Sequence, residues 1–274
     1  MVNTLYRLRQ RYLYSTIILR QLIITEFKLR YQGSVLGYVW SLLKPLLLFV
    51  ILYVVFADFL RVGDKVPHFP VYLLVGVVLW NYFIEVTTGS ITSIASRGDL
   101  IRKINFPKYV IVLSGCASAI INLLLNSIVI GIFMIFTGVD TGLHAVLVIP
   151  LIIELTALAL GIGFLLSALY VKYRDVSYIW EVLMQAAFYA TPILYPVSLV
   201  ADKSKLAAQV LLLNPVAQSI QDIRYVLITP QTKTLLDLYH DGLIWLVPIS
   251  IVIIVTTLSS VYFRNQSKNF AENV

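Results

Sequence analysis

Long, uninterrupted apolar stretches are the feature that most constrains what this chain can fold into. Hydrophobic residues make up 59% of its 274 positions and charged residues only 13%, and the mean hydropathy is +0.86. A soluble domain of this length has too little interior to bury that much apolar surface. The apolar stretches are continuous and do not alternate with polar residues, which favours membrane-spanning helices over a β-barrel. The sequence therefore predicts an all-α polytopic membrane protein.

A helix needs about 20 apolar residues to cross a bilayer, and by that measure the chain contains six spans. The predicted spans are 37–60, 69–94, 109–137, 143–171, 176–195 and 243–263. Lys and Arg gather before the first span, after the second, after the fourth and after the last. An excess of basic residues marks the cytoplasmic side, so we expect both termini to be cytoplasmic. The net charge of +7 comes mostly from this asymmetry, and no nucleic-acid partner is expected.

The N-terminal residues 1–32 are amphipathic and not continuously apolar. Leu8 and Tyr12 fall on one helical face, and Arg7 and Arg11 fall on another. This pattern predicts a helix that lies in the membrane surface, in contact with membrane lipid. A solvated N-terminal arm is the alternative.

Residues 196–238 also do not fit a simple bundle. They contain the run LAAQVLLLNP at 206–215, which is apolar but too short to cross a membrane, and an amphipathic stretch at 216–228. A short apolar helix of this kind must enter the membrane and return, shielded by protein. We therefore expect a re-entrant helical pair at the outer mouth of the bundle, with a turn at its Asn-Pro step. The residues expected there are Asn214, Pro215, Asp222 and Arg224. An ordinary extracellular loop with surface helices is the alternative.

Catalytic chemistry is largely absent from the sequence. The chain contains no Gly-Lys dipeptide, so it has no phosphate-binding loop of the Walker type. Its three histidines, His68, His144 and His240, are scattered, and Cys116 is its single cysteine, so no metal site is expected. We expect no catalytic residue and no cofactor in this chain.

Polar and aromatic side chains at membrane depth are the candidate functional residues. A charged side chain facing lipid costs at least ~2.5 kcal/mol, so Glu85 and Glu154 should face the protein interior or a hydrophilic path. Tyr and Trp add aromatic faces on which sugar rings stack, together with polar tips. The residues expected to line or border a translocation path are Trp40, Trp80, Tyr82, Glu85 and Tyr189. Internal hydrogen bonds for the glutamates, and interfacial anchoring for the aromatics, are the alternatives.

Four blocks in order resemble the membrane subunit of an ABC-2 type polysaccharide exporter. They are RYQGSVLGYVWSLLKPLLLFVILYVVF at 30–56, LIRKINFPKYVIVLS at 100–114, YRDVSYIWEVLMQAAFYATPILYP at 173–196 and LLNPVAQSIQDIRYVL at 212–227. This family moves lipid-linked O-antigen, capsular polysaccharide or wall teichoic acid. The family pattern often has a proline near position 112, where this chain has Val112.

The resemblance implies a single ABC-2 type transmembrane domain over residues 1–274, acting as a homodimer in the bacterial cytoplasmic (inner) membrane. Two copies of a separate ATPase subunit would bind ATP and Mg, and the substrate would be a lipid-linked glycan. It also implies an interface helix at 1–32, an outer gate at 196–238 and a coupling helix at 96–108 that docks on the ATPase. The residues expected to couple to the ATPase are Asp99, Arg102, Lys103, Phe106 and Pro107, with Arg174 and Asp175 as a second contact. A plain basic loop is the alternative for 96–108.

Three other functions are weighed against this one. An ABC-2 exporter of drugs or lipids would share the six-span plan, but the compact length, the Phe-Pro step and the Arg-Asp-Val block argue against it. An ATP-independent channel or carrier would show broken helices in matching halves, and no such repeat is visible. A membrane glycosyltransferase would need paired acidic motifs, whereas Asp99 and Asp175 are isolated.

Overall fold

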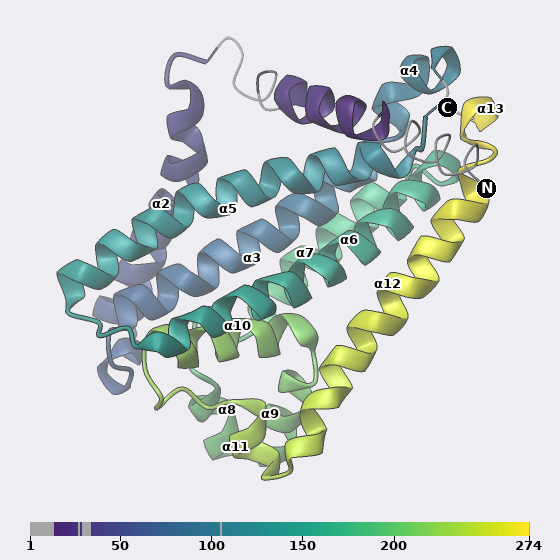
Figure 1. Cartoon of the computed structure of the whole chain (residues 1–274). Helices are drawn as coiled ribbons and strands as arrows, with labels where there is room; N and C mark the ends of the chain where they lie inside the picture. The colour runs from purple at the N-terminus through teal and green to yellow at the C-terminus, as the bar shows by residue number, and fades with distance from the viewer. Residues whose placement is uncertain (1–13, 27, 29–33, 105, 274) are drawn as a thin grey trace.

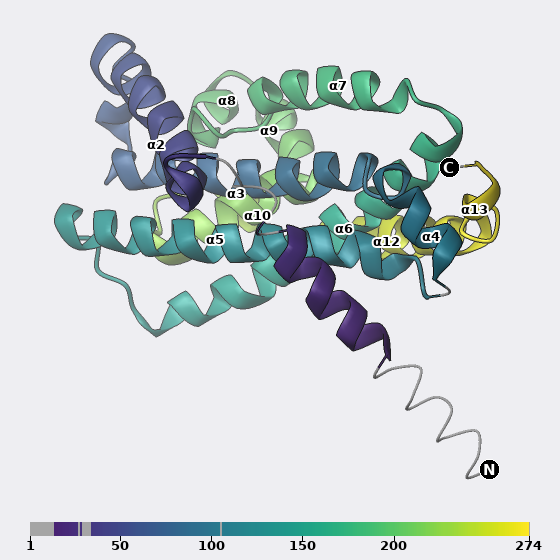
Figure 2. The ribbon, with the colours of Figure 1, turned by 90° about the horizontal axis from the view of Figure 1, so that it is seen from above.

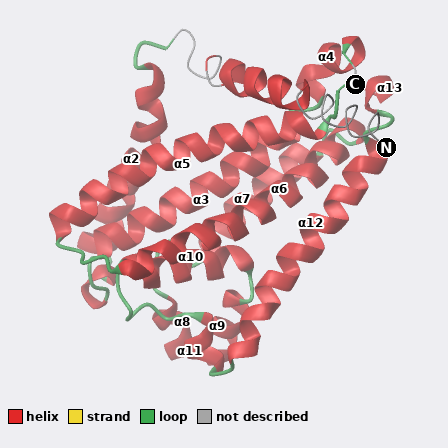
Figure 3. Ribbon diagram, viewed as in Figure 1, coloured by secondary structure: helices red, strands yellow, loops and turns green. Residues whose placement is uncertain are grey.

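A computed structural model of the chain describes residues 14–26, 28, 34–104 and 106–273 (Figure 1). Within those ranges every regular element is helical, and loops join the helices (Figure 3). Five segments are long and apolar enough to cross a membrane: Trp40–Phe59, Phe69–Ile91, Tyr109–Thr137, Leu143–Lys172 and Gly242–Gln266. The predicted class, an all-α polytopic membrane protein, is confirmed.

The predicted count of six spans is not confirmed, because the fifth predicted span is a shorter helix. α7 covers Val176–Ala190, which is 15 residues. At about 1.5 Å per residue it is roughly 22 Å long, against a hydrocarbon core of about 30 Å. The helix stops because Pro192 pushes Thr191 into an extended conformation, with ψ at 141°.

α3 (Phe69–Ile91) is the central helix and the most buried of the spans. It lies between α5 (Tyr109–Thr137) and α7, as Figure 2 shows, and it also packs on α6 (Val148–Lys172). Glycines bring these helices close together. A Cβ on Gly163 of α6 would lie 2.6 Å from Ser90 Oγ, and one on Gly161 would lie 2.8 Å from the Cα of Thr256 in α12 (Leu246–Gln266).

α2 (Trp40–Tyr53), which continues as a π-helical turn at Val54–Phe59, lies at the edge of the bundle. Its contacts are with α3 and α5. Pro45 has no N–H to donate to the carbonyl of Ser41, four residues earlier. That carbonyl instead accepts a hydrogen bond of 3.3 Å from Asn126 Nδ2 of α5. The proline in this span is therefore accommodated by a polar contact with the neighbouring helix.

The short helices gather at the two ends of the molecule (Figure 1). At one end lie α4 (Gly98–Lys103), α13 (Phe270–Asn273) and a helical stretch at 14–26. The other end carries α8 (Val197–Lys203), α9 (Lys205–Leu212), α10 (Pro215–Leu227) and α11 (Leu235–Tyr239). The region predicted to hold two short helices thus holds four. Leu8, Tyr12, Arg7 and Arg11, on which the interfacial helix was predicted, lie outside the described residues.

Candidate functional site

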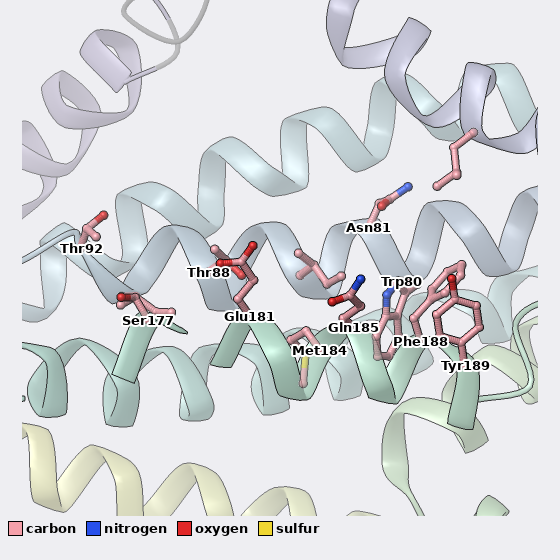
Figure 4. Close-up of a pocket in the computed structure, with 13 residues that line it drawn as sticks. Trp80, Asn81, Thr88, Thr92, Ser177, Glu181, Met184, Gln185, Phe188 and Tyr189 are labelled. Atoms are coloured by element: carbon pink, nitrogen blue, oxygen red, sulfur yellow. The ribbon is translucent and has the colours of Figure 1, made fainter. Parts of the chain in front are cut away.

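A groove of about 620 Å³ runs along α3 and α7 and reaches Leu48 of α2 (Figure 4). Ser177, Glu181 and Gln185 line it from α7, and their four-residue spacing places them on one helical face. Three further polar residues line it from α3 and its C-terminal end: Asn81, Thr88 and Thr92. In Figure 4 Thr92 and Ser177 lie at one end and Tyr189 lies at the other. Two helices therefore face each other across a space lined by these polar groups and by the apolar side chains of Leu48, Ile84, Ile91 and Met184.

Aromatic side chains close one end of the groove. The ring centroids of Trp80 and Phe188 are 6.1 Å apart, and the rings of Phe188 and Tyr189 meet edge to face at 5.3 Å. Trp80 is only 3% exposed, and its indole Nε1 has no hydrogen-bond partner among the described residues. A buried N–H without an acceptor is costly, so Trp80 is one unsatisfied polar group beside the aromatic end of the groove.

The structure brings two of the five predicted path residues together, Trp80 and Tyr189. Tyr82 points instead toward α6, where its hydroxyl lies 2.7 Å from Thr156 Oγ1. Glu85 points toward α5 and accepts a hydrogen bond of 2.7 Å from Asn122 Nδ2. Trp40 lies at the start of α2 and is 44% exposed, away from the groove-lining residues.

The short helix α4 presents a charged surface because its opposite face is packed. Ile101 and Phe106 are buried in a cluster with the ends of α5, α6 and α12 and with Phe270 of α13. Asp99 lies in the first turn of α4, and Arg102 and Lys103 lie in its last turn, as the helix dipole favours. All three side chains are exposed, whereas Pro107 is half-buried in the turn before α5.

A second charged turn joins α6 to α7. Arg174 and Asp175 are both exposed there. The guanidinium of Arg174 lies over the ring of Tyr170, 4.9 Å from its centroid. The structure therefore exposes the charged residues of both predicted coupling segments, on α4 and in the turn at 174–175, whereas Phe106 is buried.

A polar cluster joins the helical stretch at 14–26 to the base of α4. Glu26 and Arg97 form an ion pair at 3.3 Å, and Ser114 of α5 donates a hydrogen bond of 3.0 Å to the same carboxylate. Arg97 also donates to the hydroxyl of Ser114 at 3.1 Å. Nothing in the sequence pattern indicated this cluster, because its three members are far apart along the chain.

The end opposite α4 is organised around α10. Asn214 caps this helix by accepting a hydrogen bond from the amide of Val216, and Pro215 occupies its first turn. Asp222 accepts hydrogen bonds from the side chains of Gln218 and Trp245. Burial raises the pKa of the Asp222 carboxyl, and these two hydrogen bonds oppose the rise.

Arg224 is fully buried on the same helix. Its guanidinium donates to the backbone carbonyls of Tyr72, Pro192 and Ile193.

Comparison with known proteins identifies the fold just described. Residues 18–228 match the family model described as ABC-2 type transporter. The chain belongs to this family. The matched range contains the groove, α4, the turn at 174–175 and α10. Each candidate region therefore lies within the ABC-2 part of the chain.

Curated relatives of this ABC-2 chain are export permeases. An O-antigen export system permease protein of Myxococcus xanthus is 29% identical over 270 residues, covering 97% of this chain and 98% of the relative. A protein of the same name from Klebsiella pneumoniae is 31% identical over 252 residues, covering 90% of this chain and 91% of the relative. The predicted resemblance to ABC-2 permeases is confirmed, and the chain is a multi-pass membrane protein.

Proposed function

We propose that this chain is the membrane permease subunit of an ATP-driven exporter of lipid-linked polysaccharide. The observation that carries the proposal is the groove between α3 and α7, with its polar strips and its aromatic end. The relatives named as O-antigen export permeases match this chain over nearly its whole length, which favours a glycan over drugs or lipids as the substrate.

The groove is suited to a glycan because it offers side-chain hydrogen bonds along its length. Asn81, Thr88 and Gln185 can exchange hydrogen bonds with sugar hydroxyls, and Glu181 can accept them. The rings of Trp80, Phe188 and Tyr189 add aromatic faces at one end of the groove, on which sugar rings can stack. Many weak, repeated contacts of this kind let a polymer bind and still advance.

A second copy of the chain completes the path in this proposal. The walls of α2 and α7 beside the groove carry exposed apolar side chains, among them Val50, Ile51, Val182 and Leu183. Two copies related by a two-fold axis would face each other across these helices, as closed homodimers do. The path would then run between two equivalent grooves.

A separate ATPase supplies the energy in this proposal, and this subunit is not an enzyme. Two ATPase copies, which bind ATP and Mg, dock on the exposed face of α4 and on the turn at 174–175. The basic residues near α4 favour a cytoplasmic position for that end and for both termini, and we propose that the membrane is the bacterial inner membrane. Residues 196–238 then cap the outer end as the gate.

The proposal is tested by complementing a strain that lacks the gene. Glu181→Leu combined with Gln185→Leu should abolish most surface polysaccharide at an unchanged amount of protein in the membrane. Ser250→Leu makes the same kind of change at an exposed position of α12 outside the groove, and it should leave export normal. If deletion of the gene leaves surface polysaccharide unchanged, the function is wrong. If deletion abolishes surface polysaccharide but the double variant exports normally, the function stands and the groove is not the path.

A further inference from the structure

Arg224 carries a charge that no carboxylate balances among the residues that the structure describes. It is 0% exposed, and its Nε, Nη1 and Nη2 donate to three backbone carbonyls at 2.9, 2.6 and 2.7 Å. Its guanidinium also lies over the ring of Tyr72, 3.7 Å from the centroid. A buried cation is retained at such a position only when its surroundings hold it with well-placed dipoles.

Two of the three carbonyls that Arg224 binds lie at the break after α7. Pro192 ends that helix, so the carbonyls of Pro192 and Ile193 have no place in a helical hydrogen-bond ladder, and both residues are buried. A planar guanidinium presents parallel N–H groups that suit two neighbouring oxygens, and an ammonium group does not. Arg224 thereby satisfies the broken end of α7 and holds it to the carbonyl of Tyr72 on α3.

Gly76 makes room for this arrangement on α3. A Cβ at that position would overlap Nη2 of Arg224 and lie 3.3 Å from the carbonyl oxygen of Ile193. Gly76 lies four residues, about one helical turn, before Trp80. Pro192 and Ile193 follow Tyr189 closely along the chain, so both sides of the contact lie next to the aromatic end of the groove.

We propose that Arg224 is a positioning residue for the groove: by fastening α10 to α3 and to the end of α7, it fixes how Trp80 faces Phe188 and Tyr189. This inference rests on the proposed function of the groove. It makes α10 part of the wall that holds the path, and α10 also joins that wall to a second small core, which Ala217 shares with α8, α9 and α11.

The first measurement reads the position of α7 against α10 without using transport. The chain has one cysteine, so Cys116→Ala gives a background in which Ala186→Cys and Tyr225→Cys, both exposed, accept spin labels. Labelled chains are diluted into unlabelled chains within the full complex, so that only distances inside one chain are read. Arg224→Met, Arg224→Lys and Gly76→Ala should each broaden or shift the distance distribution. Gly131→Ala, where an added methyl meets nothing within 4 Å, should leave it unchanged.

The second measurement is surface polysaccharide with the unlabelled variants. The same three substitutions should lower export while ATP hydrolysis by the complex persists. Gly76→Ala combined with Arg224→Met should be no worse than the more severe single change, because both act through one contact. Should Arg224→Met fail to fold, Arg224→Lys and Gly76→Ala still decide the question.

The two measurements separate the possible failures. An unchanged distance distribution in folded Arg224 and Gly76 variants overturns the proposal, as does a changed distribution with normal export. If the variants alter the distances but deletion of the gene does not affect surface polysaccharide, the proposed function is wrong. Arg224 would then still fasten α10 to α3 and α7.

Discussion

Each end of this molecule contains a polar cluster built around an arginine, and the two clusters differ in how deeply that arginine is buried. At the end that carries α10, the guanidinium of Arg224 is fully buried and is held by three backbone carbonyls. At the other end, Arg97 and Glu26 are 22% and 25% exposed and pair beside Ser114. Water cannot replace a lost partner of Arg224, but it can replace a partner of Arg97. The difference indicates a rigid end around α10 and an adjustable end near α4, where the ATPase is proposed to dock.

The comparison predicts, first, that Arg224→Ala causes the largest loss of stability. Three buried carbonyls lose their donor, and the loss in unfolding free energy should be roughly 3–5 kcal/mol. Unfolding of the purified protein in detergent measures it, with Arg97→Ala as the comparison. Equal losses for the two arginines would contradict the assigned difference between the ends.

Glu26→Gln should have a smaller effect on stability. The ion pair with Arg97 is partly exposed and therefore screened, so its loss should cost about 1 kcal/mol or less. Raising the salt concentration should reduce the difference between the variant and the parent protein. A loss of stability as large as that of Arg224→Ala would show that the cluster near α4 is as rigid as the cluster around Arg224.

Asp222→Asn should produce a small effect whose sign depends on pH. Burial raises the pKa of Asp222 in the folded protein, so its contribution to stability is present at low pH and is lost as the pH rises through that raised pKa. Asn cannot ionise, so the variant should gain stability relative to the parent as the pH rises. The test is to measure the unfolding free energies of the variant and the parent from acidic to alkaline pH. A gain in stability of the variant confined to acidic pH would contradict a raised pKa for Asp222.

Charge reversal on α4 should have the smallest effect on stability and a severe effect on transport. Arg102→Glu with Lys103→Glu changes exposed side chains, so the unfolding free energy should change by about 0.5 kcal/mol or less. Surface polysaccharide should nevertheless be lost, because the proposed docking surface has changed sign. Normal export, together with co-purification of the ATPase, would exclude α4 as the coupling element.

The sequence was sufficient for the class and for the helical periodicity, but not for the direction of each side chain. α3 is surrounded by other helices, and its polar residues point in several directions: Asn81 and Thr88 line the groove, Glu85 faces α5 and Tyr82 faces α6. Polarity alone therefore does not indicate which of Trp80, Tyr82 and Glu85 faces the groove. On α7 the signal was present: Glu181 and Gln185 recur at a four-residue interval on an otherwise apolar helix.

Two other features could not be predicted, for different reasons. The partners of Arg224 are backbone carbonyls more than thirty residues away, so no side-chain pattern marks them. The length of α7 depends on where Pro192 breaks it, and the apolar residues beyond the break still resemble a continuing span.

The central claim is that a glycan passes along the groove between α3 and α7. A photo-reactive residue placed at Gln185, in the groove, tests it most directly, with Ile128 on the exposed face of α5 as the matched position. Cells making the polysaccharide are irradiated while the exporter is active, and the chain is probed for attached glycan. We expect adducts at position 185 that disappear when ATP hydrolysis is blocked, and none at position 128. Equal labelling at both positions, or adducts at 128 alone, would contradict it.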